Sequence, residues 1–189
     1  MRWDSLFDDL EMQLEGERTA EELDLAAEEE RLRLGRLSLR DRLLALTRAS
    51  GDGPLRIGLV DGGRAVIHPH TIGRDWMSGP LDDGRQGIIP LAAIASLSLA
   101  PVEVPTSLGP VDPDTISARL GLPFVLRDLC RRRRFVELGV SGGILAGTID
   151  RVGRDHLDLA VHERGMPRRE SAVREVLLVP LHRLVLVRA

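Results

Sequence analysis

Four consecutive arginines, Arg131–Arg134, are the residues of this sequence best suited to binding chemistry. Each guanidinium can hold a phosphate through two parallel hydrogen bonds, so the run could contact the backbone of a nucleic acid. Arg127 precedes the run by one helical turn, and a second basic pair follows in a later loop. The predicted nucleic-acid or partner-binding residues are Arg127, Arg131, Arg132, Arg133, Arg134, Arg168 and Arg169.

The arginine run also has two interpretations that involve no nucleic acid. Positive side chains stabilise the C-terminal end of a helix because they complement its dipole, and they then face solvent. The run could instead pair with the acidic N-terminal segment of the chain or with a protein partner. Because aromatic residues make up only 3% of the sequence, few side chains are expected to stack on single-stranded bases beside these arginines.

The other reactive side chains lack the spacing that a catalytic or metal site needs. No intervals typical of metal ligands separate His68, His70, His156 and His162. Asp75 and Asp155 each follow a Gly-Arg pair, where a carboxylate usually hydrogen-bonds its own turn. Cys130 lies on an apolar helix face, which is typical of a buried, unreactive thiol. We therefore expect no catalytic residue, no metal and no cofactor, and predict that the protein is not an enzyme.

Charge is distributed unevenly along the 189 residues. The net charge is only −3, and all 26 basic residues are arginines. Residues 1–35 carry 4 arginines against 12 acids, a net charge of −8, whereas residues 101–189 carry 14 against 11, a net charge of +3. An acidic head thus precedes a mildly basic body, and the chain as a whole is not an obvious polyanion binder.

The sequence favours a cytoplasmic protein without a membrane association. It holds one cysteine, so no internal disulfide can form. Acidic residues occupy the N-terminal stretch where a signal peptide would be apolar. No apolar run approaches the roughly 20 residues of a membrane-spanning helix.

The segment from Phe135 to Ala189 has the patterning of a β-meander. Apolar and polar residues alternate through Val136–Val140 and again through His156–Leu159, as in half-buried strands. Gly142-Gly143 supplies residues that tolerate the positive φ of a hairpin turn. The pattern predicts five strands closed into a small barrel.

The body of the chain contains an internal repeat of about 80 residues. Ile72-Gly-Arg-Asp-Trp76 aligns with Val152-Gly-Arg-Asp-His156 at an offset of 80, and Ile89-Pro-Leu with Val179-Pro-Leu at an offset of 90. Each copy is predicted to be a short helix followed by a five-strand barrel, with a 3₁₀ turn after the proline. The predicted organisation is an acidic helical segment (1–35), a first helix and barrel (36–100), a Pro-rich linker (101–113) and a second helix and barrel (114–189).

Two helices are predicted in the acidic head. Trp3, Phe7 and Leu10 recur on one helical face, which makes them candidates for contacting a protein partner or a second copy of the chain. Thr19–Glu22 has the spacing of a capping box and begins a second helix that runs to about Leu34.

The repeat resembles the Sm-like and SH3-like small barrels. The resemblance rests on Val136-Glu-Leu, Gly142-Gly143, Gly147-Thr-Ile, the segment from Val152 to Leu159, and Val176-Leu-Leu-Val-Pro-Leu. It implies tandem five-strand barrels in a mainly β fold with helices. The whole chain is also similar to a group of actinobacterial proteins that begin with an acidic helix of the MRW type, a similarity that implies no activity.

Two functions are therefore predicted, and both are non-catalytic. The first is binding of RNA or another nucleic acid through the arginine-rich helix end and the second barrel. The alternative is a protein-interaction or scaffold role, in which the barrels and the acidic helices dock on a partner.

Overall fold

The computed structural model describes residues 22–51, 53–111, 116–166 and 168–189. They belong to two units, one ending at Ser38 and one spanning Leu39–Ala189, which we describe separately. The described part of the first unit is a helix over residues 22–36, on which Arg33 pairs with Glu30 at 2.6 Å. The predicted contact residues Trp3, Phe7 and Leu10 lie outside the described residues.

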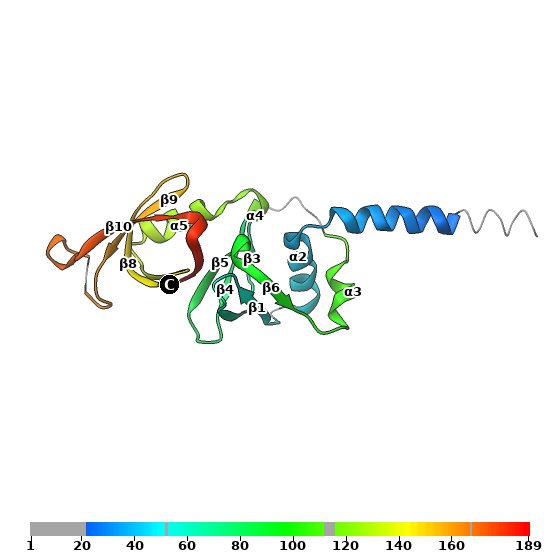
Figure 1. The fold of residues 1–189 in the computed structure, drawn as a ribbon, viewed down its shortest axis with the longest axis horizontal. Coiled ribbons are helices and arrows are strands. Elements are labelled where there is room, and N and C mark those ends of the chain that lie inside the picture. Colours follow the sequence, from blue (N-terminus) through cyan, green and yellow to red (C-terminus); the bar gives the residue numbers. More distant parts are fainter. Residues whose placement is uncertain (1–21, 52, 112–115, 167) are drawn as a thin grey trace, which may run out of the picture. The chain divides into compact units, whose positions relative to one another are not determined.

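The second unit combines helices with two antiparallel sheets (Figure 1). Its elements, in chain order, are α2 Leu39–Ser50, β1 Leu55–Leu59, β2 Arg64–Ile67, β3 Thr71–Ile72, β4 Trp76–Pro80, β5 Gln86–Pro90, the 3₁₀ turn η1 Leu91–Ala93, β6 Ile94–Ser98, α3 Glu103–Ser107, α4 Ile116–Arg119, α5 Leu122–Arg131, β7 Phe135–Val140, β8 Gly143–Val152, β9 His156–Val161, the 3₁₀ turn η2 Glu170–Ala172, β10 Glu175–Pro180, the 3₁₀ turn η3 Leu181–Arg183 and β11 Leu184–Arg188. We call residues 39–100 the first copy and residues 116–189 the second copy. No helix in the described part of the chain is long and apolar enough to cross a membrane.

One of the sheets runs through both copies. A small sheet has the order β2-β1-β6, and an eight-stranded sheet has the order β10-β9-β8-β7-β11-β5-β4-β3. The two copies meet where β11 pairs with β5, with Val187 opposite Ile88 and Arg188 opposite Gly87. We call this pairing the internal junction.

The prediction that each copy closes into a barrel is wrong at the level of strand pairing. Among the described strands, β6 pairs with β1 alone, and the outer edge of β11 is occupied by β5 instead of β10. The first copy is also divided between the sheets because Pro69, which has no N–H, interrupts its second strand. The flanking residues still bond to β4, through His68 N to Pro80 O (2.8 Å) and His70 N to Ser78 O (2.9 Å).

Matching hydrogen bonds occur at the turns of the two copies. The amide of Gly73 donates to Trp76 O, and the amide of Gly153 donates to His156 O, both at 2.8 Å. The 3₁₀ turns are held in the same way, because Leu91 N donates to Asp75 O (2.9 Å) and Leu181 N donates to Asp155 O (2.8 Å). A 3₁₀ turn follows Pro90 in the first copy and Pro180 in the second, as the repeat predicts.

The first strands of the two copies are related by an offset of 81, whereas the Gly-Arg-Asp turns are related by an offset of 80. Gly58 lies opposite Ser96, and Gly139 lies opposite the equivalent residue, Leu186. Both strand pairs carry a register shift beside the glycine. A shift of one residue reverses the face on which every side chain lies, so the structural alignment places Arg56 over Glu137.

Each copy has its own apolar core, and each also contributes to the core of the other. Leu43 of α2 and Leu126 of α5, equivalent in the repeat, are fully buried. Trp76 and Ile88 of the first copy pack in the core of the second, whereas Val185 and Leu186 of β11 pack in the core of the first. The predicted division into 36–100 and 114–189 stays a prediction.

Part of the predicted linker is helical. α3 lies within residues 101–113 and packs against α2. Arg42 of α2 donates two hydrogen bonds to Ser107 Oγ (3.2 and 2.6 Å), and that hydroxyl donates to Val104 O (2.7 Å). The buried Ser107 side chain is thus fully engaged.

Candidate nucleic-acid interface

The arginine run forms the C-terminal end of α5 and the turn after it. Arg133 N donates to Cys130 O (3.0 Å) and Arg134 N donates to Leu129 O (3.2 Å), the two bonds of a Schellman motif. Arg133 therefore occupies the left-handed position, with φ of 49°, where glycine is the usual residue. The motif turns the chain sharply from α5 into β7.

The four arginines do not all face solvent in the same way. Arg131 and Arg132 both pair with Asp128, at 2.9 and 2.7 Å, one helical turn earlier. Arg133 and Arg134 are exposed, and no ion pair of theirs is found among the described residues. The single negative charge of Asp128 therefore offsets one of the four positive charges of the run within α5.

The second predicted basic pair divides between two environments. Arg168 donates to both carboxylate oxygens of Asp150 on β8, one bond measuring 2.8 Å. The Cys130 thiol of α5 donates to the carbonyl oxygen of Asp150 (3.3 Å), so Arg168 lies near the C-terminal end of the helix. Arg169 is exposed in the loop. Arg168 thus lies near the arginine run, but the carboxylate of Asp150 neutralises its charge.

A groove of about 490 Å³ lies at the opposite, N-terminal end of α5. Three of its lining residues are arginines, Arg74, Arg127 and Arg154, and one is Phe124. Phe124 is 53% exposed, although Phe is among the residue types most often buried. Arg127 is positioned by a hydrogen bond to Gly153 O (3.2 Å). We call these four side chains the aromatic–arginine groove.

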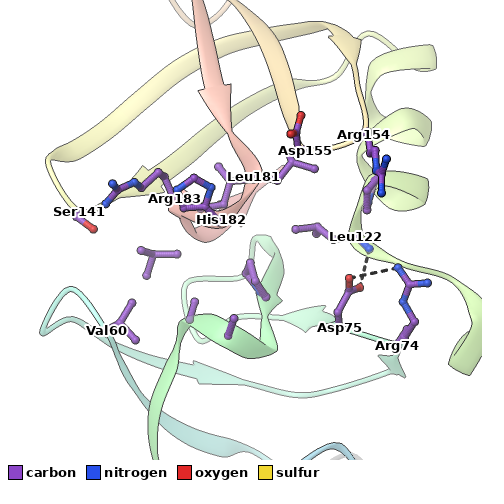
Figure 2. Close-up of a pocket in the computed structure, with 16 residues that line it drawn as sticks. Val60, Arg74, Asp75, Leu122, Ser141, Arg154, Asp155, Leu181, His182 and Arg183 are labelled. Carbon is purple, nitrogen blue, oxygen red and sulfur yellow. Dashed lines mark hydrogen bonds and ion pairs between the residues drawn. The ribbon is translucent and has the colours of Figure 1, made fainter.

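A pocket of about 570 Å³ adjoins the groove and lies between the two copies (Figure 2). It shares Arg74, Pro123 and Arg154 with the groove, and η3 adds His182 and Arg183. Equivalent positions of the repeat therefore face one pocket, because Arg74 and Arg154 are related by the offset of 80.

The two carboxylates of this pocket have structural partners. Asp75 Oδ1 accepts a hydrogen bond from Leu122 N (2.7 Å) at the start of α5, and Arg74 lies 3.7 Å from its other oxygen, as the dashed lines in Figure 2 show. A hydrogen bond from His156 (2.8 Å) holds the pKa of Asp155 below its ordinary value. Arg154 and Arg183 have no ion pair among the described residues, so the pocket presents positive charge.

Two of the histidines, His68 and His162, contact other side chains of the second unit. His162 is buried, lies 2.8 Å from Thr148 Oγ1 and packs edge-on against Phe135. His68 lies 3.5 Å from Asp82. In the described ranges, no three His, Cys, Asp or Glu side chains converge on a position where a metal could bind.

Phe124, Arg74, Arg154 and Arg183 are the residues that the sequence interpretation missed. The repeat offered a signal for two of them, since Arg74 and Arg154 occupy the same turn of each copy. No sequence signal identified Phe124, because its exposure depends on which face of α5 packs on the sheet. Comparison with known proteins gave no match to a family model, a curated protein or a solved structure.

Proposed function

We propose that this protein is a non-catalytic nucleic-acid-binding protein whose ligand is single-stranded, with RNA the first candidate. The observation that carries the proposal is the aromatic–arginine groove, where exposed Phe124 lies beside three arginines. Proteins that hold single strands combine aromatic rings, on which bases stack, with a positively charged path for the backbone. The arrangement in this groove has both parts.

The contacts suggest a division of roles. A base stacks on Phe124 while Arg74 and Arg154 bind the flanking phosphates. Arg183 extends the positive path into the adjoining pocket. α5 is ten residues long, so its other end, with exposed Arg133 and Arg134, lies about 15 Å away along the axis. Both ends of α5 are within reach of one short oligonucleotide.

A titration with a labelled single-stranded RNA tests the proposal. We expect Phe124→Ala to weaken binding by about 1–3 kcal/mol, because stacking on one aromatic ring contributes that much. Arg154→Ala should weaken it and reduce the slope of log affinity against log salt by about 0.7, the value for one phosphate contact to a single strand. Arg64→Ala, an exposed arginine of β2, is the matched control and should bind as the wild type does.

Fluorescence anisotropy at low salt, repeated with DNA and with duplex RNA, measures these affinities. A wild-type protein that binds no single strand at low salt contradicts the proposal. Equal affinities for wild type and Phe124→Ala would contradict the role of the groove, and a loss confined to variants of Arg133 and Arg134 would move the site to the other end of α5.

We further propose that each copy is a small barrel of the Sm-like or SH3-like kind whose pairing is left open. In its support, β10-β9-β8-β7-β11 is the order four-three-two-one-five for the strands of the second copy, and a 3₁₀ turn joins the last two. We also propose that the protein is cytoplasmic, which is consistent with its single cysteine, Cys130, being a free thiol.

A second candidate function is docking on a protein partner through the acidic helix of residues 22–36. It is favoured by Leu25 and Leu32, which lie two turns apart and are 65% and 54% exposed. Apolar side chains repeated along an acidic helix suit a hydrophobic groove on another protein. A wild-type protein that binds no single-stranded RNA at low salt would favour this second function.

A further inference from the structure

Two terminal strands of the sheets in the second unit, β6 and β10, each pair with a single strand among the described residues. The smaller sheet ends on β2 and β6, and the larger one ends on β10 and β3. Unpaired edges present free backbone N–H and C=O groups and readily pair with another strand. The internal repeat indicates which strands the open edges of β6 and β10 could pair with.

β6 and β10 are the repeat equivalents of the two strands that form the internal junction. The offset of 90 carries β5 onto β10 and β6 onto β11. Strand four of the first copy and strand five of the second are thus paired, whereas strand five of the first copy and strand four of the second are left over. A β10 from one molecule therefore has the complement of its edge in the β6 of another.

Side-chain exposure distinguishes the used edge from the unused one. Ile88, which faces β11 in the internal junction, is 6% exposed, but its equivalent Leu178 on β10 is 68% exposed. Leu122, at the start of α5, packs in the same core as Ile88 and is 5% exposed. Its equivalent Leu39, at the start of α2, is 39% exposed. The positions that the internal junction buries are the ones that the free edges leave open to solvent.

The charges beside the free edges are also complementary. In the internal junction, Arg85 Nη1 donates to Glu137 Oε2 (2.5 Å). The offset of 90 places Glu175 at the position of Arg85, and the offset of 81 places Arg56 at the position of Glu137. The pair is reversed in sign but remains opposite in charge. Arg56 and Glu175 are exposed, and neither has an ion pair within the described residues.

We propose that copies of this chain assemble head to tail by pairing β10 of one molecule with β6 of the next, in the register of the internal junction. Leu178 then lies opposite Leu97 and Leu177 opposite Ser98, while Glu175 reaches Arg56. Because the two edges differ, the contact is heterologous and repeats from molecule to molecule until a ring closes. The assembly is separate from the aromatic–arginine groove and does not depend on its function.

Charge reversal on the full chain tests the assembly. Size-exclusion chromatography with light scattering should give a wild-type mass several times that of one chain, falling on dilution. Arg56→Glu and Glu175→Arg should each shift the assembly to at least tenfold higher concentration, because each places like charges together. The double variant restores an opposite pair at every contact and should assemble as the wild type does. Circular dichroism checks that each variant is folded.

A disulfide between molecules tests the register. Ala189 N donates to Gln86 O (3.0 Å), so the adjacent pair Arg188 and Gly87 is a non-hydrogen-bonded pair, in which side chains approach closely. Ser98→Cys and Leu177→Cys, made separately in a Cys130→Ser background, occupy the equivalent positions. Mixed under oxidising conditions, they should give a covalent dimer that neither variant gives alone.

Three results would overturn the proposal. A wild-type chain that stays monomeric up to its solubility limit leaves no assembly to explain. An oligomer that neither charge reversal weakens is held by another surface. A mixture of the two cysteine variants that does not cross-link, although the wild type assembles, rules out this register.

Discussion

The side chain of greatest interest at the C-terminal end of α5 is Arg133. An L-residue at φ of 49° has its Cβ close to the neighbouring carbonyl oxygen, a cost that glycine avoids. An arginine thus occupies a position where the backbone conformation disfavours any residue with a Cβ. It lies directly beside exposed Arg134.

Arg133→Gly should therefore stabilise the protein by about 0.5–1 kcal/mol, since relief of strain exceeds the added entropy of the unfolded chain. Urea unfolding measures the change. Arg134→Gly is the matched control, because Arg134 is not at positive φ, and it should leave stability unchanged or reduce it. Loss of stability in Arg133→Gly would mean that its side chain makes a contact worth more than the strain.

At the scale of elements, the internal junction pairs only a few residues of β5 and β11, and an ion pair between the two copies stabilises it. Glu137 of β7 receives hydrogen bonds from Arg85, in the loop before β5, and from Arg164 (2.8 Å), whose guanidinium also lies 5.0 Å from the ring of Phe135. Burial alone would raise the pKa of Glu137, but the two arginines outweigh it and hold the pKa below its ordinary value of 4.5.

This lowered pKa predicts how the junction responds to acid. A carboxyl whose pKa is lower in the folded protein stabilises it above the unfolded pKa, and that contribution is lost as the pH falls through the folded pKa. Glu137→Gln should therefore be less stable than wild type at pH 7, and the difference should shrink below about pH 4.5. Urea unfolding at a series of pH values measures it. Asp24→Asn, in the helix of residues 22–36, is the control, and a constant difference for Glu137→Gln would contradict the linkage.

Part of the element-level structure follows from local sequence rules. Gly73 and Gly153 are needed because a Cβ at either would lie within 3 Å of the ring three residues on, at Trp76 or His156. Pro90 and Pro180 mark the strand ends before the 3₁₀ turns. Both features are local, and the 3₁₀ turn after each proline was predicted from the sequence.

The features that sequence did not predict depend on pairing between distant segments. The offset of 81 in the first strands depends on the register shifts beside Gly58 and Gly139, which are visible only against β6 and β11. The prediction of closed barrels was wrong because β5 pairs with the edge of β11. No sequence pattern within one copy indicates that pairing. The groove was missed for the same reason, since Phe124 and Arg74 come from different copies.

For the whole second unit, the shared cores predict that both copies unfold together. Trp76 belongs to the first copy, yet it is 4% exposed within the core of the second and its Nε1 donates to Leu120 O (2.9 Å). Its neighbour Met77 packs in the core of its own copy. Adjacent residues of β4 thus fix both cores.

Trp76→Ala should destabilise the protein by about 3–5 kcal/mol, the usual cost of deleting a buried Trp side chain. Hydrogen exchange should accelerate in α5 and β11 of the second copy as well as in β4. Met77→Ala serves as the comparison, with its first effect in the core formed by α2 and β1. Faster exchange confined to residues 39–100 in Trp76→Ala would show that the copies are independent.

The covalent connection through residues 99–121 gives the internal junction an advantage that a contact between molecules lacks. Tethered partners meet at an effective concentration on the order of millimolar, whatever the concentration of the protein. Two strands that pair over a few residues can therefore stay joined at any dilution, although the same surface on separate chains would come apart. Any assembly of this chain would contain an even number of repeat copies, with tethered and dissociable contacts in alternation.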